Sequence, residues 1–497
     1  MNKSWLPFRL ALPSLKLMIC LTATVAWADE RPAQVQTARL QSLVEVKKLA
    51  FKPRALEIKA WKTLTGAKVL FVRTAALPMF DIHISFAAGS ARDGAVPGLA
   101  ATTFALLNEG VPGKDLSAII ETFDGLGAQL EMDIDHDRAD FSLRSLSDPA
   151  KRTPALNLLT QVFSEPLLSE ERLTPVKNEL RAALAEQRKN AGLQAEQGIK
   201  AMLAPDSPFS HSVYGTEAGL SAVTRAAVQD FHRRYYAANH AQITLVGDLS
   251  VEQAQEISLQ ISNALPSAAD TFTASAETTP GTVMSSHIEL AQRQTHIVFA
   301  QPSVPRRHSD YAALYAASEI LGGGGGNSRL MTELRHKRSL VYDVYSEGKD
   351  WAQGSGILTI NLQTGSQFSE AVVAEVRVLL NDFLREGPTR EELRQLQHRL
   401  ANKHVLNSAS NRQILARLVQ INRYDLPLDL DYTLQQVQRL TREDIKLALN
   451  RHLSTDRWLS VTAGASVEQQ PLPPPVTLPS GQTDKGMCRV NPGFVAS

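Results

Sequence analysis

The sequence predicts an α+β protein of two similar domains, and two observations support this prediction. The first is length, because 497 residues exceed what one hydrophobic core usually fills. The second is an internal repeat: VTRAAVQDFHRRYYAANHAQITLVGD, from Val223 to Asp248, aligns without a gap with LTREDIKLALNRHLSTDRWLSVTAGA, from Leu440 to Ala465. The copies lie 217 residues apart, so we expect both domains to end with the same elements.

Each copy of the repeat predicts a helix followed by a strand. A Thr-Arg pair opens both copies, threonine is a suitable N-cap, and the apolar residues that follow recur at helical spacing. A short run rich in β-branched residues then ends near a glycine, which is typical of a strand. Both domains should therefore close with helix and then strand.

Upstream segments of the two halves also correspond. DFSLRSL, from Asp140, and GILTINLQT, from Gly356, alternate like strands, and each precedes two long helical patterns. We expect the second helix of each pair to start after a proline, Pro175 or Pro388. The domains are thus predicted at residues 40–265 and 286–468, joined by a Ser/Thr/Ala-rich linker at 266–285.

Residues 1–28 have the pattern of a signal peptide. Three basic residues, Lys3, Arg9 and Lys16, precede or flank a charge-free run of 12 residues, which is too short to span a bilayer. Ala26-Trp27-Ala28 supplies small residues for cleavage, which would leave 29–39 as an N-terminal extension. We expect a periplasmic or secreted protein, with an uncleaved anchor as the alternative.

The cysteines and the C-terminal tail complete the outline. Removal of residues 1–28 would take Cys20 with it, so that Cys488 remains alone and no internal disulfide can form. The tail at 469–497 contains QPLPPPVTLPSG, and its prolines cannot continue a helix or a central strand. We expect this tail to be extended and mobile.

Composition and motifs exclude several classes of function. The chain has 52 Lys and Arg residues against 51 Asp and Glu residues. Its net charge is therefore too small to attract nucleic acid or anionic lipid. The glycine run lacks the Lys-Ser/Thr of a phosphate-binding loop, and no G-x-S-x-G elbow occurs. The acidic run DIDHD, from Asp133 to Asp137, lies in an alternating pattern, so a solvated strand face is favoured over a cation site.

Four stretches together resemble the pitrilysin/insulinase family of zinc peptidases, in its processing-peptidase branch. They are FAAGSARDG from Phe86, PGLAATTFALLNEG from Pro97, FSHSVYGT from Phe209, and LGGGGGNSRLMTELRHKRSLVYDVYS from Leu321. Their order and spacing agree with the family over most of the chain after residue 40. The resemblance implies two homologous domains, each an antiparallel sheet packed with helices.

The family's metal-binding motif is missing from this chain. Active members carry H-x-x-E-H on the helix after the GLA turn, where two histidines bind zinc and the glutamate is the general base. The matching positions hold Ala101, Phe104 and Ala105, while the third zinc ligand is matched by Glu179. No metal or other cofactor is therefore expected. The closest two of the 12 histidines are six residues apart, which leaves open only a site built from distant segments.

The resemblance also implies a substrate-contacting wall in the second domain. There the family places an arginine and a tyrosine, matched by Arg335 and Tyr342, near the backbone of a bound peptide. A glycine-rich loop touches substrate in the non-catalytic partner of two-subunit relatives. Its counterpart consists of Gly322, Gly323, Gly324, Gly325 and Gly326. The alternative is structural: Arg335 would cap a helix and Tyr342 would pack in the sheet.

These features lead to one functional hypothesis and two alternatives. We expect a non-catalytic subunit that forms a heterodimer with a homologous H-x-x-E-H zinc peptidase and holds peptide in a shared chamber. We expect that it does not bind nucleic acid and does not insert stably into a membrane. The first alternative is a structural or assembly subunit without a peptidase role. The second is an active zinc endopeptidase that uses unrecognised ligands.

Overall fold

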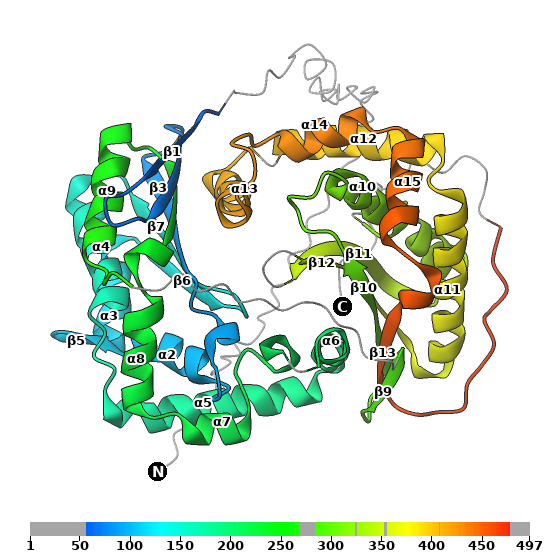
Figure 1. The fold of residues 1–497 in the computed structure, drawn as a ribbon, viewed down its shortest axis with the longest axis horizontal. Coiled ribbons are helices and arrows are strands. Elements are labelled where there is room, and N and C mark those ends of the chain that lie inside the picture. The colour runs from blue at the N-terminus through cyan, green and yellow to red at the C-terminus, as the bar shows by residue number, and fades with distance from the viewer. Residues whose placement is uncertain are drawn as a thin grey trace, which may run out of the picture. The chain divides into compact units, whose positions relative to one another are not determined.

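The computed structural model describes residues 56–205, 207–268, 284–323, 326–351, 355–406 and 408–477. The predicted signal peptide, both cysteines and most of the predicted linker lie outside these residues. We call residues 56–268 the N-terminal half and residues 284–477 the C-terminal half. The α+β class is confirmed, since each half contains one large sheet and several helices (Figure 1).

The sheet of the N-terminal half has six strands in the order β1-β2-β8-β3-β7-β6. They are β1 (Ile58–Lys62), β2 (Lys68–Arg73), β3 (Met79–Phe86), β6 (Gln129–Ile134), β7 (Ala139–Leu146) and β8 (Gln242–Gly247). All neighbouring strands are antiparallel except β2 and β8, which run parallel. Strand β8, the last along the chain, is inserted between β2 and β3. A separate two-stranded ladder joins β4 (Gly110–Val111) to β5 (Lys114–Asp115).

The sheet of the C-terminal half repeats this topology with five strands in the order β11-β12-β10-β13-β9. They are β9 (Ser285–Glu289), β10 (Gln294–Ser303), β11 (Val341–Trp351), β12 (Ser355–Gly365) and β13 (Leu459–Gly464). Here too one pair is parallel, β9 with β13, and the other pairs are antiparallel. Each sheet is therefore mainly antiparallel. In each, the last strand along the chain lies between two early strands: β8 lies between β2 and β3, and β13 lies between β9 and β10.

The sequence repeat corresponds to the same elements in both halves. Helix α8 (Arg225–Tyr235) and helix α15 (Arg442–His452) occupy equivalent positions in the repeat, as do β8 and β13. Thr224 caps α8 by accepting the N–H of Ala227, and Thr441 caps α15 by accepting the N–H of Asp444. The prediction of helix then strand at both places is confirmed.

The other helices pack on the sheets and build one core in each half. The N-terminal half has α2 (Leu99–Leu107), α3 (Leu116–Leu126), α4 (Pro149–Ser164), α5 (Glu170–Lys189), α7 (Glu217–Ala222) and α9 (Val251–Asn263). The C-terminal half has α10 (Tyr311–Leu321), α11 (Ser369–Glu386), α12 (Arg390–Leu406) and α14 (Tyr432–Arg439). Aromatic rings lie at the centre of the core of the N-terminal half. The ring centroid of Phe86 lies 5.1 Å from that of Tyr236 and 5.9 Å from that of Phe141.

The predicted start of one helix is wrong. Helix α5 begins at Glu170 and contains Pro175 in its second turn, whereas Pro388 does precede α12 as expected. A proline this close to a helix start removes one backbone hydrogen bond but leaves the turn before it intact. Glu170 and Glu171 at the positive end of the helix dipole favour that additional turn.

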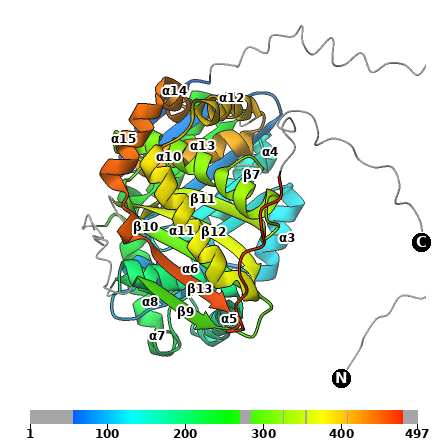
Figure 2. The same cartoon turned by 90° about the vertical axis from the view of Figure 1, so that its right-hand side faces the viewer.

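Two helices cross from one half to the sheet of the other. Helix α6 (Ala191–Leu203) follows α5 in the N-terminal half but packs on β10 and β13 (Figure 2). Helix α13 (Asn411–Tyr424) belongs to the C-terminal half but packs on β2, β3 and β8 (Figure 1). The two halves are thus joined by a reciprocal exchange of helices.

The described part of the tail is anchored to the C-terminal half. The N–H of Gln470 donates to the carbonyl of Gln367 at 2.7 Å, and the N–H of Val476 donates to that of Lys337 at 2.8 Å. Leu472 packs on the core of this half. The tail is extended, as its prolines predict, but up to residue 477 these contacts hold it in place.

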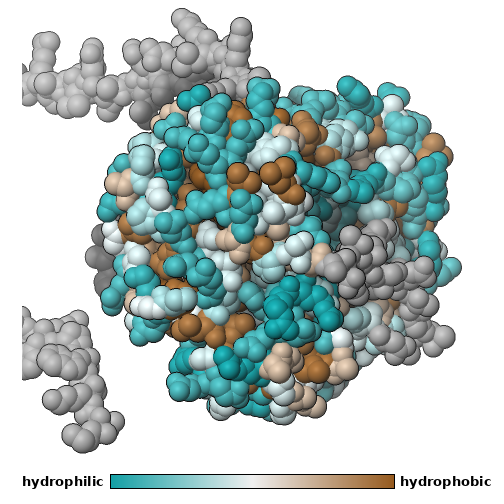
Figure 3. Space-filling view, turned by 60° about the vertical axis from the view of Figure 1, so that its left-hand side comes forward, coloured by the Kyte–Doolittle hydropathy of each residue, from teal (hydrophilic) through white to brown (hydrophobic). Residues whose placement is uncertain are grey.

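One face of the molecule is mainly polar. In the face drawn in Figure 3, hydrophobic residues are scattered among hydrophilic ones, as is normal for a folded domain. None of the described helices combines the length and apolar character needed to cross a membrane.

Candidate functional site

The helix that carries the family motif, α2, starts at a turn built by Asp93 and Gly98. Gly98 adopts φ 109°, which favours glycine, and a Cβ there would lie 2.8 Å from Leu220 Cδ2. The buried carboxylate of Asp93 accepts the N–H groups of Gly98 at 2.7 Å and Ala100 at 2.6 Å. Burial raises the pKa of Asp93 to about 7, although these two hydrogen bonds oppose the rise.

The three motif positions belong to the hydrophobic core. Ala101 is buried, and the ring of Phe104 lies 5.6 Å from that of Phe141. Phe104 and Ala105 are partly buried and pack against the same core. Glu179 is exposed on α5. Side chains without lone pairs cannot bind a cation, so these residues do not fit the zinc ion of active relatives.

Arg335 and Tyr342 are brought together by a tight turn before β11. The guanidinium of Arg335 lies over the ring of Tyr342, 4.6 Å from its centroid, and donates to the Tyr342 carbonyl. The Tyr342 side chain is 82% exposed, so the structural alternative, in which it packs in the sheet, is wrong. The Arg335 side chain, in the last turn of its short helix, contacts Tyr342 across this turn.

The glycine loop is described only in part. Gly322 and Gly323 are buried at the end of α10, whereas Gly326 is exposed and its carbonyl accepts from His336 Nε2 at 2.6 Å. Gly324 and Gly325 lie outside the described residues. The loop therefore leaves a core helix and reaches the surface close to the segment that carries Arg335.

The acidic run differs from its prediction. Strand β6 ends at Ile134, and residues 135–138 form the turn to β7 instead of continuing the strand. Asp133 is exposed as expected, whereas Asp135 and Asp137 are only half-exposed and His136 between them is buried. The reason is docking of this turn on the FAAGSARDG segment, where the N–H groups of Gly89, Ser90 and Ala91 donate to its carbonyls. A Cβ on Gly89 would lie 2.5 Å from the turn's backbone, so the close approach requires glycine.

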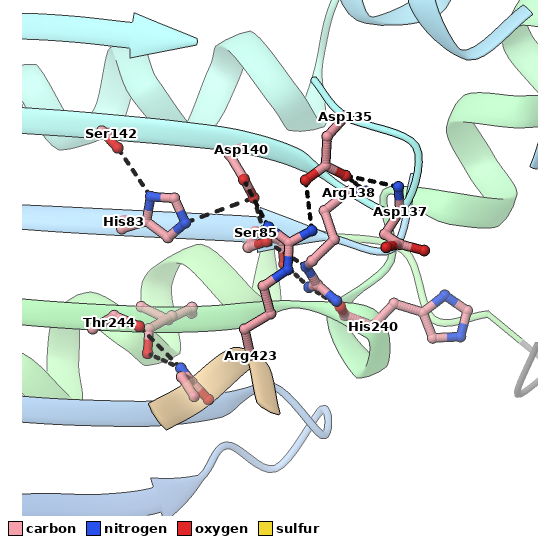
Figure 4. Close-up of polar contacts among 12 residues, drawn as sticks. His83, Ser85, Asp135, Asp137, Arg138, Asp140, Ser142, His240, Thr244 and Arg423 are labelled. Atoms are coloured by element: carbon pink, nitrogen blue, oxygen red, sulfur yellow. Dashed lines mark hydrogen bonds and ion pairs between the residues drawn. The ribbon is translucent and has the colours of Figure 1, made fainter. Parts of the chain in front are cut away.

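Beside this turn, a buried polar network joins the two halves (Figure 4). Arg423, from α13, donates to Asp135 Oδ2 at 2.5 Å, and its other nitrogen lies 3.8 Å from Asp140 Oδ2. His83 on β3 lies 3.6 Å from Asp140 Oδ1 and hydrogen-bonds Ser142 at 2.9 Å. Burial would raise the pKa of Asp140, but His83 and Arg423 together lower it to about 2.

Asp135 and Arg423 of this network also border a cavity of about 350 Å³ between the halves. Its lining includes the turn residues Asp135 to Asp137, Glu196 and Lys200 from α6, and Phe209. The C-terminal half contributes Arg306, Lys349, Trp351 and Tyr424 to the lining. Neither Arg335 nor Tyr342 lines this cavity. Sequence reasoning missed it, although Phe209 and the acidic run, both singled out as motifs, border it.

A group of three potential metal ligands lies elsewhere, between α10 and α15. His308, Asp310 and His452 place one ligand atom each within 4.8 Å of the others. The three residues hydrogen-bond within the protein: Asp310 Oδ2 accepts from His452 at 2.7 Å and Arg451 at 2.6 Å, and His308 Nδ1 accepts the Asp310 N–H. This group ties the start of one helix to the end of another.

Comparison with known proteins gives a consistent result. Residues 222–400 match the family model described as the peptidase M16 inactive domain. A non-peptidase homolog called YmxG from Helicobacter pylori is 24% identical over 396 residues, which are 77% of this chain and 88% of that protein.

Solved structures extend the match. The crystal structure of a peptidase M16 inactive domain from Pseudomonas fluorescens aligns with TM-score 0.80 at 40% identity, over 84% of this chain and all of that one. A protease from Helicobacter pylori aligns with TM-score 0.74 at 15% identity, over 82% of this chain and 99% of that one, a likeness of fold.

Proposed function

This chain belongs to the peptidase M16 family as one of its inactive, non-peptidase members, and from this premise we propose that it is the substrate-holding subunit of a heterodimer. Its partner would be a homologue that carries H-x-x-E-H and supplies zinc and the general base. The supporting observation is an asymmetry within the chain. The motif face of α2 packs against the core, whereas Tyr342 remains exposed with the half-buried Arg335 guanidinium over its ring.

Tyr342 is the residue best placed for contact with peptide. Its ring is fixed by the guanidinium of Arg335, and no hydrogen bond to a described residue occupies its hydroxyl. A phenol held in this way can donate to a peptide carbonyl with little loss of side-chain entropy. The role of Arg335 is then to position Tyr342.

Reconstitution with an H-x-x-E-H homologue from the same organism tests the proposal. Loss of one oriented donor to a reacting carbonyl typically lowers turnover about 100- to 1,000-fold, so Tyr342→Phe should lower it by about ten- to a thousandfold. Arg335→Ala should act in the same direction. Single-turnover cleavage measures the effect, and pull-down yield shows whether the pair stays together.

Two variants serve as controls. Glu179→Gln should leave turnover unchanged because this carboxylate is exposed and has no metal to bind. Tyr432→Phe makes the same chemical change as Tyr342→Phe on α14 and should also be silent. If Tyr342→Phe and Arg335→Ala leave cleavage intact in a stable complex, the assembly-subunit alternative takes the lead.

The purified chain by itself should bind no stoichiometric zinc at α2 and cleave no unstructured peptide. Metal analysis and a peptidase assay with and without chelator measure this. About one zinc per chain with chelator-sensitive cleavage would instead support the active-enzyme alternative.

We also propose export to the periplasm or beyond, with cleavage after Ala28. The sequence pattern of residues 1–28 supports it. N-terminal sequencing of the mature protein should find Asp29 first, and a mature chain that begins at Met1 would contradict export.

A further inference from the structure

We propose that the cavity between the halves binds a carboxylate of the held peptide, with the Lys200 ammonium as its partner. The inference rests on the proposed function and deepens it, because it specifies which chemical group of the substrate this chain recognises. The site is separate from the Arg335–Tyr342 pair, neither of whose residues lines the cavity.

Lys200 reaches the cavity because α6 lies close against the opposite sheet. A Cβ on Gly198 would be 3.0 Å from Val461 Cγ1, so the absence of a side chain there permits this approach. The same helix presents Glu196, Ile199 and Lys200 to the cavity. No hydrogen bond or ion pair joins the Lys200 ammonium to any residue that the structure describes, and burial lowers its pKa. A half-buried ammonium without a partner has lost part of its hydration, and a bound anion would compensate for that loss.

The other cations around the cavity already have partners. Arg306 donates to Asp350 at 2.6 Å, Arg423 donates to Asp135 at 2.5 Å, and Lys349 lies 2.7 Å from Glu347. His136 does not compete for an anion, because burial and the charge of Lys200 lower its pKa to about 4.

Four acidic groups also face the cavity and limit what can enter. Asp135 and Asp350 are held by the arginines just described, and burial together with Asp135 raises the pKa of Asp137. Glu196 lies one turn before Lys200 and is the acidic group closest to it along the helix. Its charge should weaken, but not abolish, binding of a carboxylate by Lys200.

Aromatic rings give the cavity an apolar wall. The ring centroid of Phe209 lies 5.1 Å from that of Trp351, and the Phe209 ring stacks on that of His136 with 5.3 Å between their centroids. The volume of about 350 Å³ is at the lower end of the range of about 300–1,000 Å³ typical of ligand pockets. It suits a chain end or a single acidic side chain with its apolar neighbour, not a folded domain.

Calorimetric titration of the full chain, without any partner, tests this site. Three peptides of equal length are compared: one with a free C-terminus, the same peptide amidated, and the amidated peptide with one internal glutamate. Binding of only the first identifies the terminal carboxylate as the ligand. Binding of the third but not the second identifies an acidic side chain. Equal affinity for all three, or for none, overturns the inference.

Lys200→Met should reduce affinity for the binding peptide by about ten- to a hundredfold, as expected for loss of a hydrogen bond to a charged group. Glu196→Gln, four residues away on the same helix, should keep or increase that affinity because it removes a like charge. Methionine retains the apolar stem of lysine, so thermal unfolding of Lys200→Met should match or exceed that of the parent. Unchanged affinity in this variant overturns the inference.

The two proposals can fail separately. If Tyr342→Phe lowers the turnover of the reconstituted partner while Lys200→Met leaves peptide affinity unchanged, the cavity site is wrong and the substrate-holding function stands. The opposite result is that Lys200→Met abolishes peptide binding while Tyr342→Phe and Arg335→Ala leave the partner's turnover unchanged. In that case the cavity binds peptide, but the proposed substrate-holding function is wrong.

Discussion

Helices α6 and α13 follow corresponding parts of the two halves and make the same crossing, yet they hold the opposite sheet by different means. Helix α6 uses small and apolar residues, among them Ala191, Ala195 and Ile199, which pack on β10 and β13. Helix α13 has an apolar face too, with Leu418 packed on Leu70 and Val246. It adds a polar end, formed by Asn422 and Arg423, which α6 lacks.

The polar end of α13 fixes how that helix sits. Asn422 is buried and donates to the carbonyl of Ile243 at 3.1 Å and to Thr244 Oγ1 at 3.0 Å. Apolar contacts tolerate small shifts, whereas buried hydrogen bonds are lost when the helix slides by a fraction of a turn. The comparison therefore shows one crossing held by close packing and one held in register by polar contacts.

The largest expected effect comes from breaking the polar crossing at Arg423. Arg423→Met removes the arginine that pairs with Asp135 and Asp140 and leaves His83 as the partner of Asp140, and we expect a loss of about 3 kcal/mol in the free energy of unfolding. This is the low end for a buried pair, because the side chain of Asp135 is 41% exposed and keeps some water. Denaturant unfolding followed by circular dichroism measures the loss.

Arg412→Met is the matched control. Arg412 also lies on α13 and also pairs with the β6–β7 hairpin, through Glu131, but both side chains are more than 60% exposed. An exposed pair contributes about 0–1 kcal/mol. Equal losses in the two variants would show that the buried network does not distinguish this crossing.

The next effect in size is a pH dependence at His136, on the turn that Arg423 holds. The pKa of His136 is lowered to about 4, so below pH 6.5 the unfolded chain binds a proton that the folded chain does not. Stability should therefore fall as the pH drops from 6.5 towards 4, by about 2 kcal/mol at pH 5.

His136→Gln removes this contribution and keeps a donor for the carbonyl of His211. The difference in unfolding free energy between parent and variant should therefore change by about 2 kcal/mol between pH 7 and pH 5. A difference that is constant over this range would contradict the assignment.

The smallest expected effect tests the close packing of α6. Gly→Ala in an exposed helix interior is normally stabilising by about 0.5–1 kcal/mol, which Gly125→Ala on α3 should show, since nothing lies within 4 Å of its added Cβ. At Gly198 the new methyl group meets Val461 Cγ1 at 3.0 Å, so the gain should vanish or turn into a loss. If Gly198→Ala stabilises as much as Gly125→Ala in thermal unfolding, the packing is looser than described.

Local signals explain which parts of the fold could be predicted. Thr224 and Thr441 mark helix starts through their own side chains, so the sequence repeat was enough to place α8, α15 and the strands after them. The crossings of α6 and α13 could not be predicted in this way. Periodicity shows which face of a helix is apolar, but it does not show which sheet covers that face.

The candidate site also contains parts that local sequence signals predict and parts that they do not. The missing ligands at Ala101, Phe104 and Ala105 follow from a motif within one helix. The cavity depends on segments far apart in the chain, and His136 is buried there only because residues 89–91 hold its turn. Alternation along a strand predicted that every second residue of this run faces solvent, but residues 135–138 form a turn whose exposure is determined by tertiary contacts.

The crossing of helices also has a consequence for gene truncation. A fragment that encodes only the C-terminal half would lack α6 and leave Val298, Ala300 and Val461 uncovered. A fragment that encodes only the N-terminal half would lack α13 and uncover Leu70, Val72 and Val246. Neither fragment would bury all of its apolar surface, so we expect an N-terminal fragment left by a nonsense mutation near residue 275, or either half expressed alone, to aggregate.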